Sequence, residues 1–154
     1  MKSRVVFASS FVIGGLLALS LNASAFQRRT HGSSCQDGNH SYINGENQSS
    51  SAQNQPLYCS IPDDTSMAKH QINTANAHVY HGSSTAPVYA WACVDYWHSI
   101  GGGCGNWVSA NSPGNVVTLS PPRTYWSATY ASDFGYMYIT TPQHSRLQGI
   151  YLAN

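Results

Sequence analysis

The side chains best suited to binding chemistry are aromatic residues that recur at every second position in two strand-like stretches. The two stretches are Val88–Trp97 and Phe134–Thr140. On a strand, alternation places Tyr89 and Trp91 together on one face of the first stretch. It places Tyr136 and Tyr138 together on one face of the second. If the two strands are neighbours, the four rings form an exposed platform on which sugar rings can stack, with Asp or Asn groups bonding the sugar hydroxyls, which predicts a carbohydrate-binding surface.

The opposite orientation of these strands is an open alternative. A secreted β domain that is short of Leu and Ile can fill its core with Tyr and Trp instead. In that case Tyr89 and Trp91 pack inside, and Ala90 and Ala92 face outward. The face of Val88–Trp97 that contacts solvent therefore decides whether the chain has a site on this strand.

Seven histidines raise the question of a metal site, but no ligand motif supports one. His78 and His81 are three residues apart and would point to opposite faces of a strand. Neither an H-E-x-x-H motif nor a cysteine–histidine knuckle is present. A site assembled from His78, His98 and Asp95 would rest on composition alone. We therefore predict neither a metal nor a cofactor.

Hydrolytic chemistry also lacks a motif. The chain has no G-x-S-x-G elbow, and Asp95 and His98 would diverge on a regular strand. The carboxylates are too few and too scattered to nominate an acid/base pair for glycoside cleavage. They include Glu46, Asp63, Asp64, Asp95 and Asp133. No catalytic residue is predicted, and a small secreted hydrolase stands as the second alternative function.

Four cysteines predict a disulfide framework. They are Cys35, Cys59, Cys93 and Cys104. An even number of cysteines in an exported chain favours two disulfides, and three pairings are possible. Pairing between sequence neighbours, Cys35–Cys59 and Cys93–Cys104, is the simplest choice. A zinc site is the rival, but its C-x₂₋₄-C spacing is absent.

The elements that must position these residues are short strands separated by Gly, Pro, Asn and Ser turns. The strand-like stretches are 57–62, 72–80, 88–97, 107–110, 116–119, 125–130, 134–140 and 147–152. No amphipathic helix longer than two turns is discernible. About seven or eight strands at this spacing predict an all-β fold, a single-domain antiparallel β-sandwich of jelly-roll type. A partly open barrel is the alternative.

A glycine triplet, Gly101–Gly103, separates Cys93 from Cys104. Direct pairing of the two cysteines across neighbouring strands would put the glycines inside the second strand. A loop over Ser99–Gly103 would instead place Cys104 opposite Trp97. Because glycine weakens a strand, we expect the loop, with the disulfide closing its base.

The N-terminal third of the chain divides into a leader and a polar arm. Residues 1–25 combine Lys2 and Arg4, an apolar stretch and the small-residue sequence Ala23-Ser24-Ala25, which predicts a signal peptide cleaved before Phe26. Residues 26–56 are polar and predict an N-terminal arm tied down by Cys35. Residues 57–154 are expected to form the β-sandwich core. The apolar stretch of the leader has only the minimum length that can span a membrane, which favours a cleaved signal peptide over an anchor. We therefore expect no membrane span after cleavage.

Charge and composition narrow the class of function. Charged residues make up 8% of the chain, against roughly 25% in ordinary soluble domains. No basic patch is visible, so we expect no nucleic-acid partner. The sequence predicts a secreted or periplasmic, non-catalytic binding module whose partner is a glycan or another cell-surface ligand. A structural or self-associating envelope protein is the first alternative.

Several short motifs along the mature chain resemble those of uncharacterised small secreted proteins of Gram-negative bacteria. They are Cys59-Ser60-Ile61-Pro62, Val79-Tyr80, Ala92-Cys93, Gly103-Cys104, Val117-Thr118-Leu119-Ser120, Gly135-Tyr136-Met137-Tyr138 and Leu147-Gln148-Gly149-Ile150-Tyr151, together with the early Cys35. The resemblance implies a two-disulfide β-sandwich. It supplies no activity, ligand or site residue.

Overall fold

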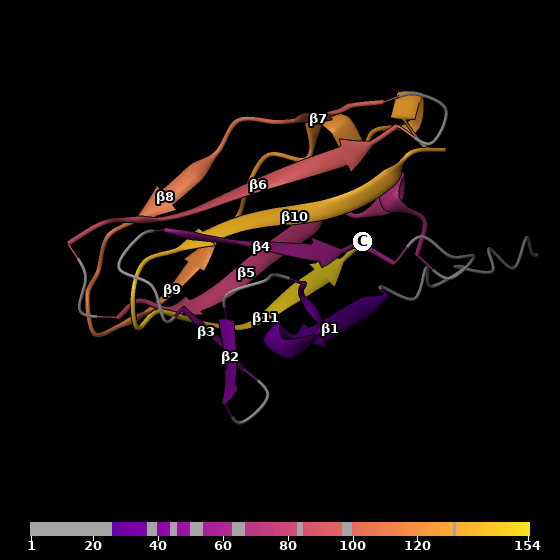
Figure 1. Ribbon diagram of the computed structural model, residues 1–154. Coiled ribbons are helices and arrows are strands. Elements are labelled where there is room, and N and C mark those ends of the chain that lie inside the picture. The colour runs from indigo at the N-terminus through magenta and orange to yellow at the C-terminus, as the bar shows by residue number, and fades with distance from the viewer. Residues whose placement is uncertain are drawn as a thin grey trace, which may run out of the picture.

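The computed structural model describes residues 26–36, 40–43, 46–49, 54–62, 67–82, 85–96, 100–130 and 132–154. These residues form two antiparallel sheets that pack face to face, which confirms the predicted β-sandwich (Figure 1). The predicted signal peptide, residues 1–25, lies outside the described residues. Within the part that is described, every helix is too short or too polar to cross a bilayer.

The larger sheet contains six of the described strands, in the order β2-β3-β11-β5-β9, with β1 also paired to β11. The strands are β1 (Gln27–His31), β2 (His40–Ile43), β3 (Glu46–Ser49), β5 (Thr74–Tyr80), β9 (Val116–Leu119) and β11 (Arg146–Ala153). One edge of β11 is shared, because β3 pairs with its first residues and β1 pairs with Gly149–Ala153. Its other edge pairs with β5 along its length, with an irregularity between Leu147 and Gly149.

The smaller sheet contains five described strands, in the order β4-β10-β6-β7, with β8 also paired to β6. The strands are β4 (Gln55–Ser60), β6 (Val88–Asp95), β7 (Gly102–Cys104), β8 (Val108–Ala110) and β10 (Phe134–Thr141). Four single 3₁₀ turns complete the described elements: η1 (Gly32–Ser34), η2 (Lys69–Gln71), η3 (Thr124–Trp126) and η4 (Ala128–Tyr130). In Figure 1 the two sheets form separate layers, with β4, β10 and β6 in one and β1, β11 and β5 in the other.

The core lies between the inner faces of the two sheets and consists mainly of small and medium aliphatic side chains. Ala90 and Ala92 of β6 are fully buried, as are Ala75 and Ala77 of β5. Larger side chains such as Leu57, Met137, Ile139, Leu147 and Leu152 fill the remaining space. Period-two alternation along each strand therefore places one apolar face inside, as a sandwich requires.

Both predicted disulfides are confirmed. Cys35 joins Cys59 and thereby ties the segment after η1 to strand β4. Cys93 joins Cys104 and bridges β6 to β7. A chain with two disulfides folds in an oxidising environment, which indicates a non-cytoplasmic compartment.

The predicted loop over the glycine triplet is wrong. Cys93 lies directly opposite Cys104, and Gly102 and Gly103 continue the strand opposite Asp95 and Val94. A Cβ atom at Gly102 would lie 2.2 Å from the Val94 carbonyl oxygen, and one at Gly103 would lie 2.6 Å from a ring carbon of Tyr125. The glycines are therefore needed because β7 lies so close to its neighbours, and close approach outweighs the average cost of glycine in a strand.

Two further segments differ from the sequence-based expectation. The polar stretch 26–56 contributes β1, β2 and β3 to the larger sheet, because strand pairing is made by backbone groups and does not require apolar side chains. The predicted strand over residues 125–130 is wrong. Trp126 is buried there, and its indole N–H donates to the carbonyl of Cys93 at 2.8 Å, which holds the segment as two 3₁₀ turns, η3 and η4.

Candidate functional site

The outer face of the smaller sheet carries a continuous row of aromatic side chains, which we call the aromatic strip. It consists of Tyr136, Tyr58, Tyr138, Trp91, Tyr89 and Trp107. Their strand neighbours Ala90, Ala92 and Met137 are fully buried. The rings therefore point away from the core, and the alternative orientation of β6 left open by the sequence does not occur.

The register of the strands brings the central rings of the aromatic strip opposite one another. Trp91 of β6 lies directly opposite Tyr138 of β10, and Tyr138 lies directly opposite Tyr58 of β4. The ring centroids are 5.1 Å apart in both pairs, with interplanar angles of 47° and 43°. Rings at this separation are in contact, so three neighbouring strands present one packed aromatic surface.

Further rings extend this centre in both directions. Tyr89 stacks on Trp91 with centroids 5.8 Å apart, and Trp107 contacts Tyr89 edge-on at 5.3 Å. At the other end Tyr136 lies 6.1 Å from Tyr58. The aromatic strip therefore crosses the sheet from β4 to the start of β8. Its rings hold one another in place, which limits the conformational entropy that a ligand must remove on binding.

Exposure differs along the aromatic strip. Trp107 is 56% exposed and Tyr58 is 47% exposed, whereas Tyr89, Trp91, Tyr136 and Tyr138 are partly buried. The partial burial follows from contact with neighbouring rings on the same face.

The four residues predicted from sequence, Tyr89, Trp91, Tyr136 and Tyr138, all belong to the aromatic strip. Tyr136 lies opposite Cys93 and reaches the other rings through Tyr58. Their role in ligand binding stays a prediction at this point.

Sequence reasoning missed Tyr58 and Trp107. Tyr58 alternates with Leu57 and Cys59, both buried, so the same period-two argument applied to β4 would have found it. Trp107 lies just before β8, outside any regular strand, and joins the strip because β8 pairs with β6 beside Tyr89. No local pattern in the sequence predicts that neighbour.

Two tyrosines of the aromatic strip, Tyr136 and Tyr138, have a raised pKa. Burial raises the pKa of Tyr138, and the nearby phenol of Tyr58 adds to the effect. Burial is also the main cause of the raised pKa of Tyr136, followed by the negative charge of Asp95. Both phenols keep their protons at neutral pH, so their hydroxyls remain hydrogen-bond donors.

Polar groups flank the Tyr136 end of the aromatic strip. Ser60 lies opposite Tyr136 on β4 and is exposed. Asp95, two residues beyond Cys93 on β6, is also exposed. A hydroxyl and a carboxylate beside an aromatic surface are the groups that bond sugar hydroxyls while the rings contact the apolar sugar faces.

The residues considered for a mixed metal site are not brought together. His78 lies on β5 in the larger sheet and Asp95 on β6 in the smaller one, while His98 lies outside the described residues. Across the described ranges, no cluster of three or more His, Cys, Asp or Glu side chains could hold a metal ion.

Comparison of the chain with protein-family models, with curated proteins and with solved structures finds no match.

Proposed function

We propose that this protein is an exported, non-catalytic carbohydrate-binding module that holds a saccharide chain along its aromatic strip. The observation that carries the proposal is the unbroken row of six contacting rings on one outer face of the sandwich. The predicted signal peptide and the two disulfides support a secreted or periplasmic location.

The chemistry of the aromatic strip suits an extended saccharide. Each pyranose ring has an apolar face of C–H groups that stacks on an aromatic ring, and the strip offers several such rings in succession. The rings lie on the outer face of a sheet and extend across four strands, so the strip fits a polymer lying across the strands better than a small sugar enclosed in a pocket. We therefore expect affinity to rise with the length of the saccharide.

Glycan-array and polysaccharide pull-down measurements test this proposal. Trp91→Ala and Tyr138→Ala should each weaken binding about tenfold, or about 1.4 kcal/mol, because each removes one stacking surface from the centre of the strip. Tyr80→Ala, which removes a partly exposed tyrosine from the larger sheet, is the matched control and should bind like the unmodified protein. Unchanged glycan binding in both strip variants, or no binding by the unmodified protein, would exclude the proposal.

Self-association is the second candidate function, because large apolar side chains are exposed on the same face. Phe134 is 69% exposed and Trp107 is 56% exposed. Exposed apolar surface of this kind also occurs at protein–protein contacts. Sedimentation analysis separates the two candidates: a self-associating protein would be oligomeric, and Trp107→Ala would dissociate it without any glycan present.

A further inference from the structure

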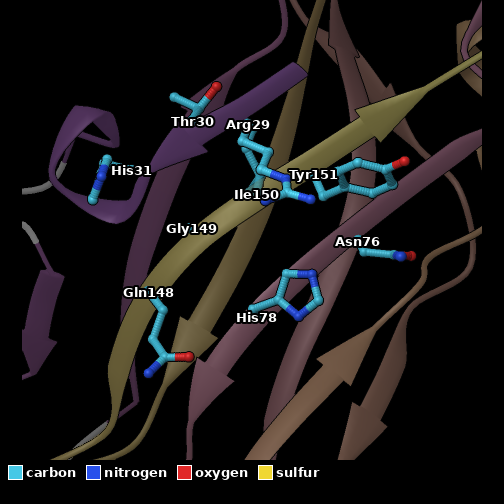
Figure 2. Close-up of a pocket in the computed structure, with 9 residues that line it drawn as sticks. All are labelled: Arg29, Thr30, His31, Asn76, His78, Gln148, Gly149, Ile150 and Tyr151. Carbon is cyan, nitrogen blue, oxygen red and sulfur yellow. The ribbon is translucent and has the colours of Figure 1, made fainter. Parts of the chain in front are cut away.

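The outer face of the larger sheet contains a hollow of about 610 Å³ between strands β1, β11 and β5 (Figure 2). Its volume is within the range of roughly 300–1,000 Å³ that small-molecule sites occupy. No sequence pattern predicts this hollow, since β1 belongs to the segment expected to form a polar arm. We call this hollow the β1–β11–β5 groove.

Two rows of side chains cross the β1–β11–β5 groove because the three strands are in register. The first row runs from Arg29 through Tyr151 to Asn76. The second runs from His31 through Gly149 to His78. Gly149, between the two histidines, lets β1 approach β11 closely, because a Cβ atom there would lie 2.5 Å from the Thr30 carbonyl oxygen.

Arg29 is the main charged group in the groove, and no acidic side chain among the described residues neutralises its positive charge. Its guanidinium carbon lies 5.8 Å from the ring centroid of Tyr151, and among the described residues it makes neither a hydrogen bond nor an ion pair. Arg146, on the same face of the sheet, differs. It lies 4.7 Å from the ring centroid of Tyr80 and also forms an ion pair with Glu46 at 3.2 Å. Stacking therefore positions Arg29 while its N–H donors stay available.

Neighbouring polar side chains are oriented by hydrogen bonds on their far sides. The hydroxyl of Ser120 donates to the Oδ1 atom of Asn76 at 2.6 Å, which leaves the Asn76 amide N–H groups to donate elsewhere. The Nδ1 atom of His78 lies 3.1 Å from the hydroxyl of Thr118, which leaves its Nε2 atom available. None of the residues that line the groove is acidic. The groove therefore presents the permanent positive charge of Arg29 together with several other polar groups.

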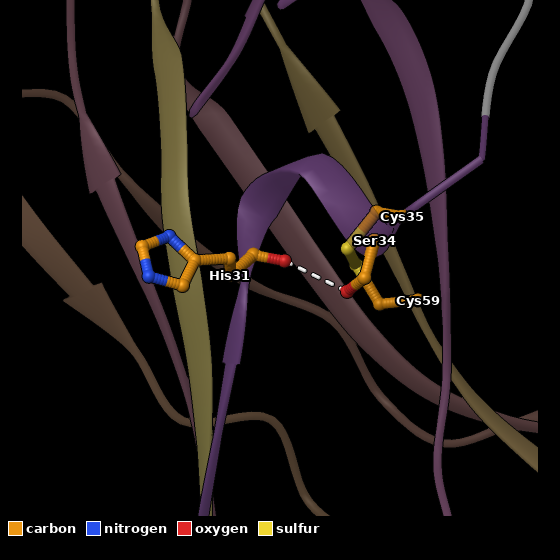
Figure 3. The surroundings of a disulfide bond; sticks show 4 residues. All are labelled: His31, Ser34, Cys35 and Cys59. Atoms are coloured by element: carbon orange, nitrogen blue, oxygen red, sulfur yellow. Dashed lines mark hydrogen bonds between the residues drawn. A yellow bond between two sulfur atoms is a disulfide. The ribbon is translucent and has the colours of Figure 1, made fainter. Parts of the chain in front are cut away.

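Strand β1, which forms one wall of the groove, is fixed at both ends. At one end the backbone N–H of Phe26 donates to the Asn154 side chain at 2.6 Å. At the other end, the hydroxyl of Ser34 in η1 donates to the His31 carbonyl at 2.7 Å, and the adjacent Cys35–Cys59 disulfide ties this turn to β4 (Figure 3). A wall held in this way positions Arg29 and His31 before any ligand arrives, which reduces the entropic cost of binding.

From these observations we infer that the β1–β11–β5 groove is a second binding site, specific for a compact ligand that carries one carboxylate. A guanidinium bonds a carboxylate through two parallel N–H donors, and a single permanent cation matches a single negative charge. Asn76 and His78 then bond polar groups on the body of the ligand. The site is independent of the aromatic strip, which lies on the other sheet.

Titration of the ¹⁵N-labelled protein with glucuronate, followed by NMR, tests this inference. Glucuronate should shift the amide signals of Arg29, Asn76 and His78. Glucose, its uncharged analogue, should bind at least tenfold more weakly. Acetate shows which kind of carboxylate the groove binds. If acetate binds as tightly as glucuronate, the ligand is a simple carboxylic acid. If acetate binds more weakly, the ligand is a sugar acid. Inorganic phosphate that binds as tightly as glucuronate would overturn the carboxylate assignment.

Variants locate the site. Arg29→Gln should weaken glucuronate binding about tenfold or more without altering the fold, since Arg29 is exposed and unpaired among the described residues. Arg146→Gln, a matched arginine on the same face, and Trp91→Ala, in the aromatic strip, should each stay within about twofold of the unmodified protein. No binding, signal shifts confined to other strands, or equal loss in Arg29→Gln and Arg146→Gln would each refute the site.

Discussion

Contact between Trp91 and Tyr138 should be measurable as a coupling free energy in the stability of the protein. The two residues are directly opposite each other on β6 and β10, and their ring centroids are 5.1 Å apart. Aromatic pairs in such contact contribute about 0.5–1.5 kcal/mol beyond the area they bury. Because both rings are partly exposed, Trp91→Ala and Tyr138→Ala should each cost less than the roughly 3–5 kcal/mol of a fully buried aromatic residue. The two single variants should therefore remain folded.

A double-mutant cycle gives the coupling free energy. Urea denaturation of the unmodified protein, both single variants and the double variant should be followed by far-ultraviolet circular dichroism with the disulfides intact, since loss of Trp91 changes the fluorescence. We expect the double variant to be more stable than additivity predicts by about 0.5–1.5 kcal/mol. Combining Tyr138→Ala with Tyr151→Ala, on the other sheet, is the control and should be additive. A coupling no larger than about 0.3 kcal/mol between Trp91 and Tyr138 would refute the packed strip, because independent sites show that much scatter.

Two other predictions concern pH and the glycines of β7. Because the pKa of Tyr138 is raised in the folded protein, unfolded chains lose this proton first as the pH rises above about 10, so stability should fall with pH in that range. Tyr138→Phe should lessen this fall in urea titrations at alkaline pH, and an identical pH dependence would contradict the shift. Gly102→Ala should cost about 1–3 kcal/mol, since its Cβ would lie 2.2 Å from the Val94 carbonyl oxygen. Thermal unfolding would show this as a lower midpoint, whereas an unchanged midpoint would mean that β7 can move away from β6.

Sequence patterns predicted which aromatic residues of the candidate site share a face of the same strand. Period-two alternation is a property of a single strand, so it placed Tyr89 with Trp91 and Tyr136 with Tyr138. Whether β6 and β10 are neighbours depends on contacts between residues far apart in the chain. From sequence alone, the pairing of the two strands could therefore only be assumed. The orientation of β6 also required the structure, because rings or alanines could fill the core equally well by composition.

The remaining differences arise where backbone geometry, and not side-chain pattern, determines the structure. Strand β1 has few apolar residues, and only its pairing with the open edge of β11 reveals that Arg29 lies beside Tyr151. The expectation of a loop over the glycines of β7 rests on the rule that glycine weakens an average strand. In this protein the space beside β6 and Tyr125 admits no Cβ atom, so the average rule does not apply.

The two proposed sites have opposite chemistry, and the sandwich keeps them separate. The aromatic strip consists of contacting aromatic rings, whereas the β1–β11–β5 groove is concave and carries the unneutralised charge of Arg29. Because each site lies on the outer face of a different sheet, with the core of Ala77, Ala90 and their neighbours between them, no ligand on one face can contact the other. Substitutions on the two faces should therefore act independently. Loss of glycan binding in Trp91→Ala together with unchanged glucuronate binding would show that the sandwich has two separate sites for ligands of different charge.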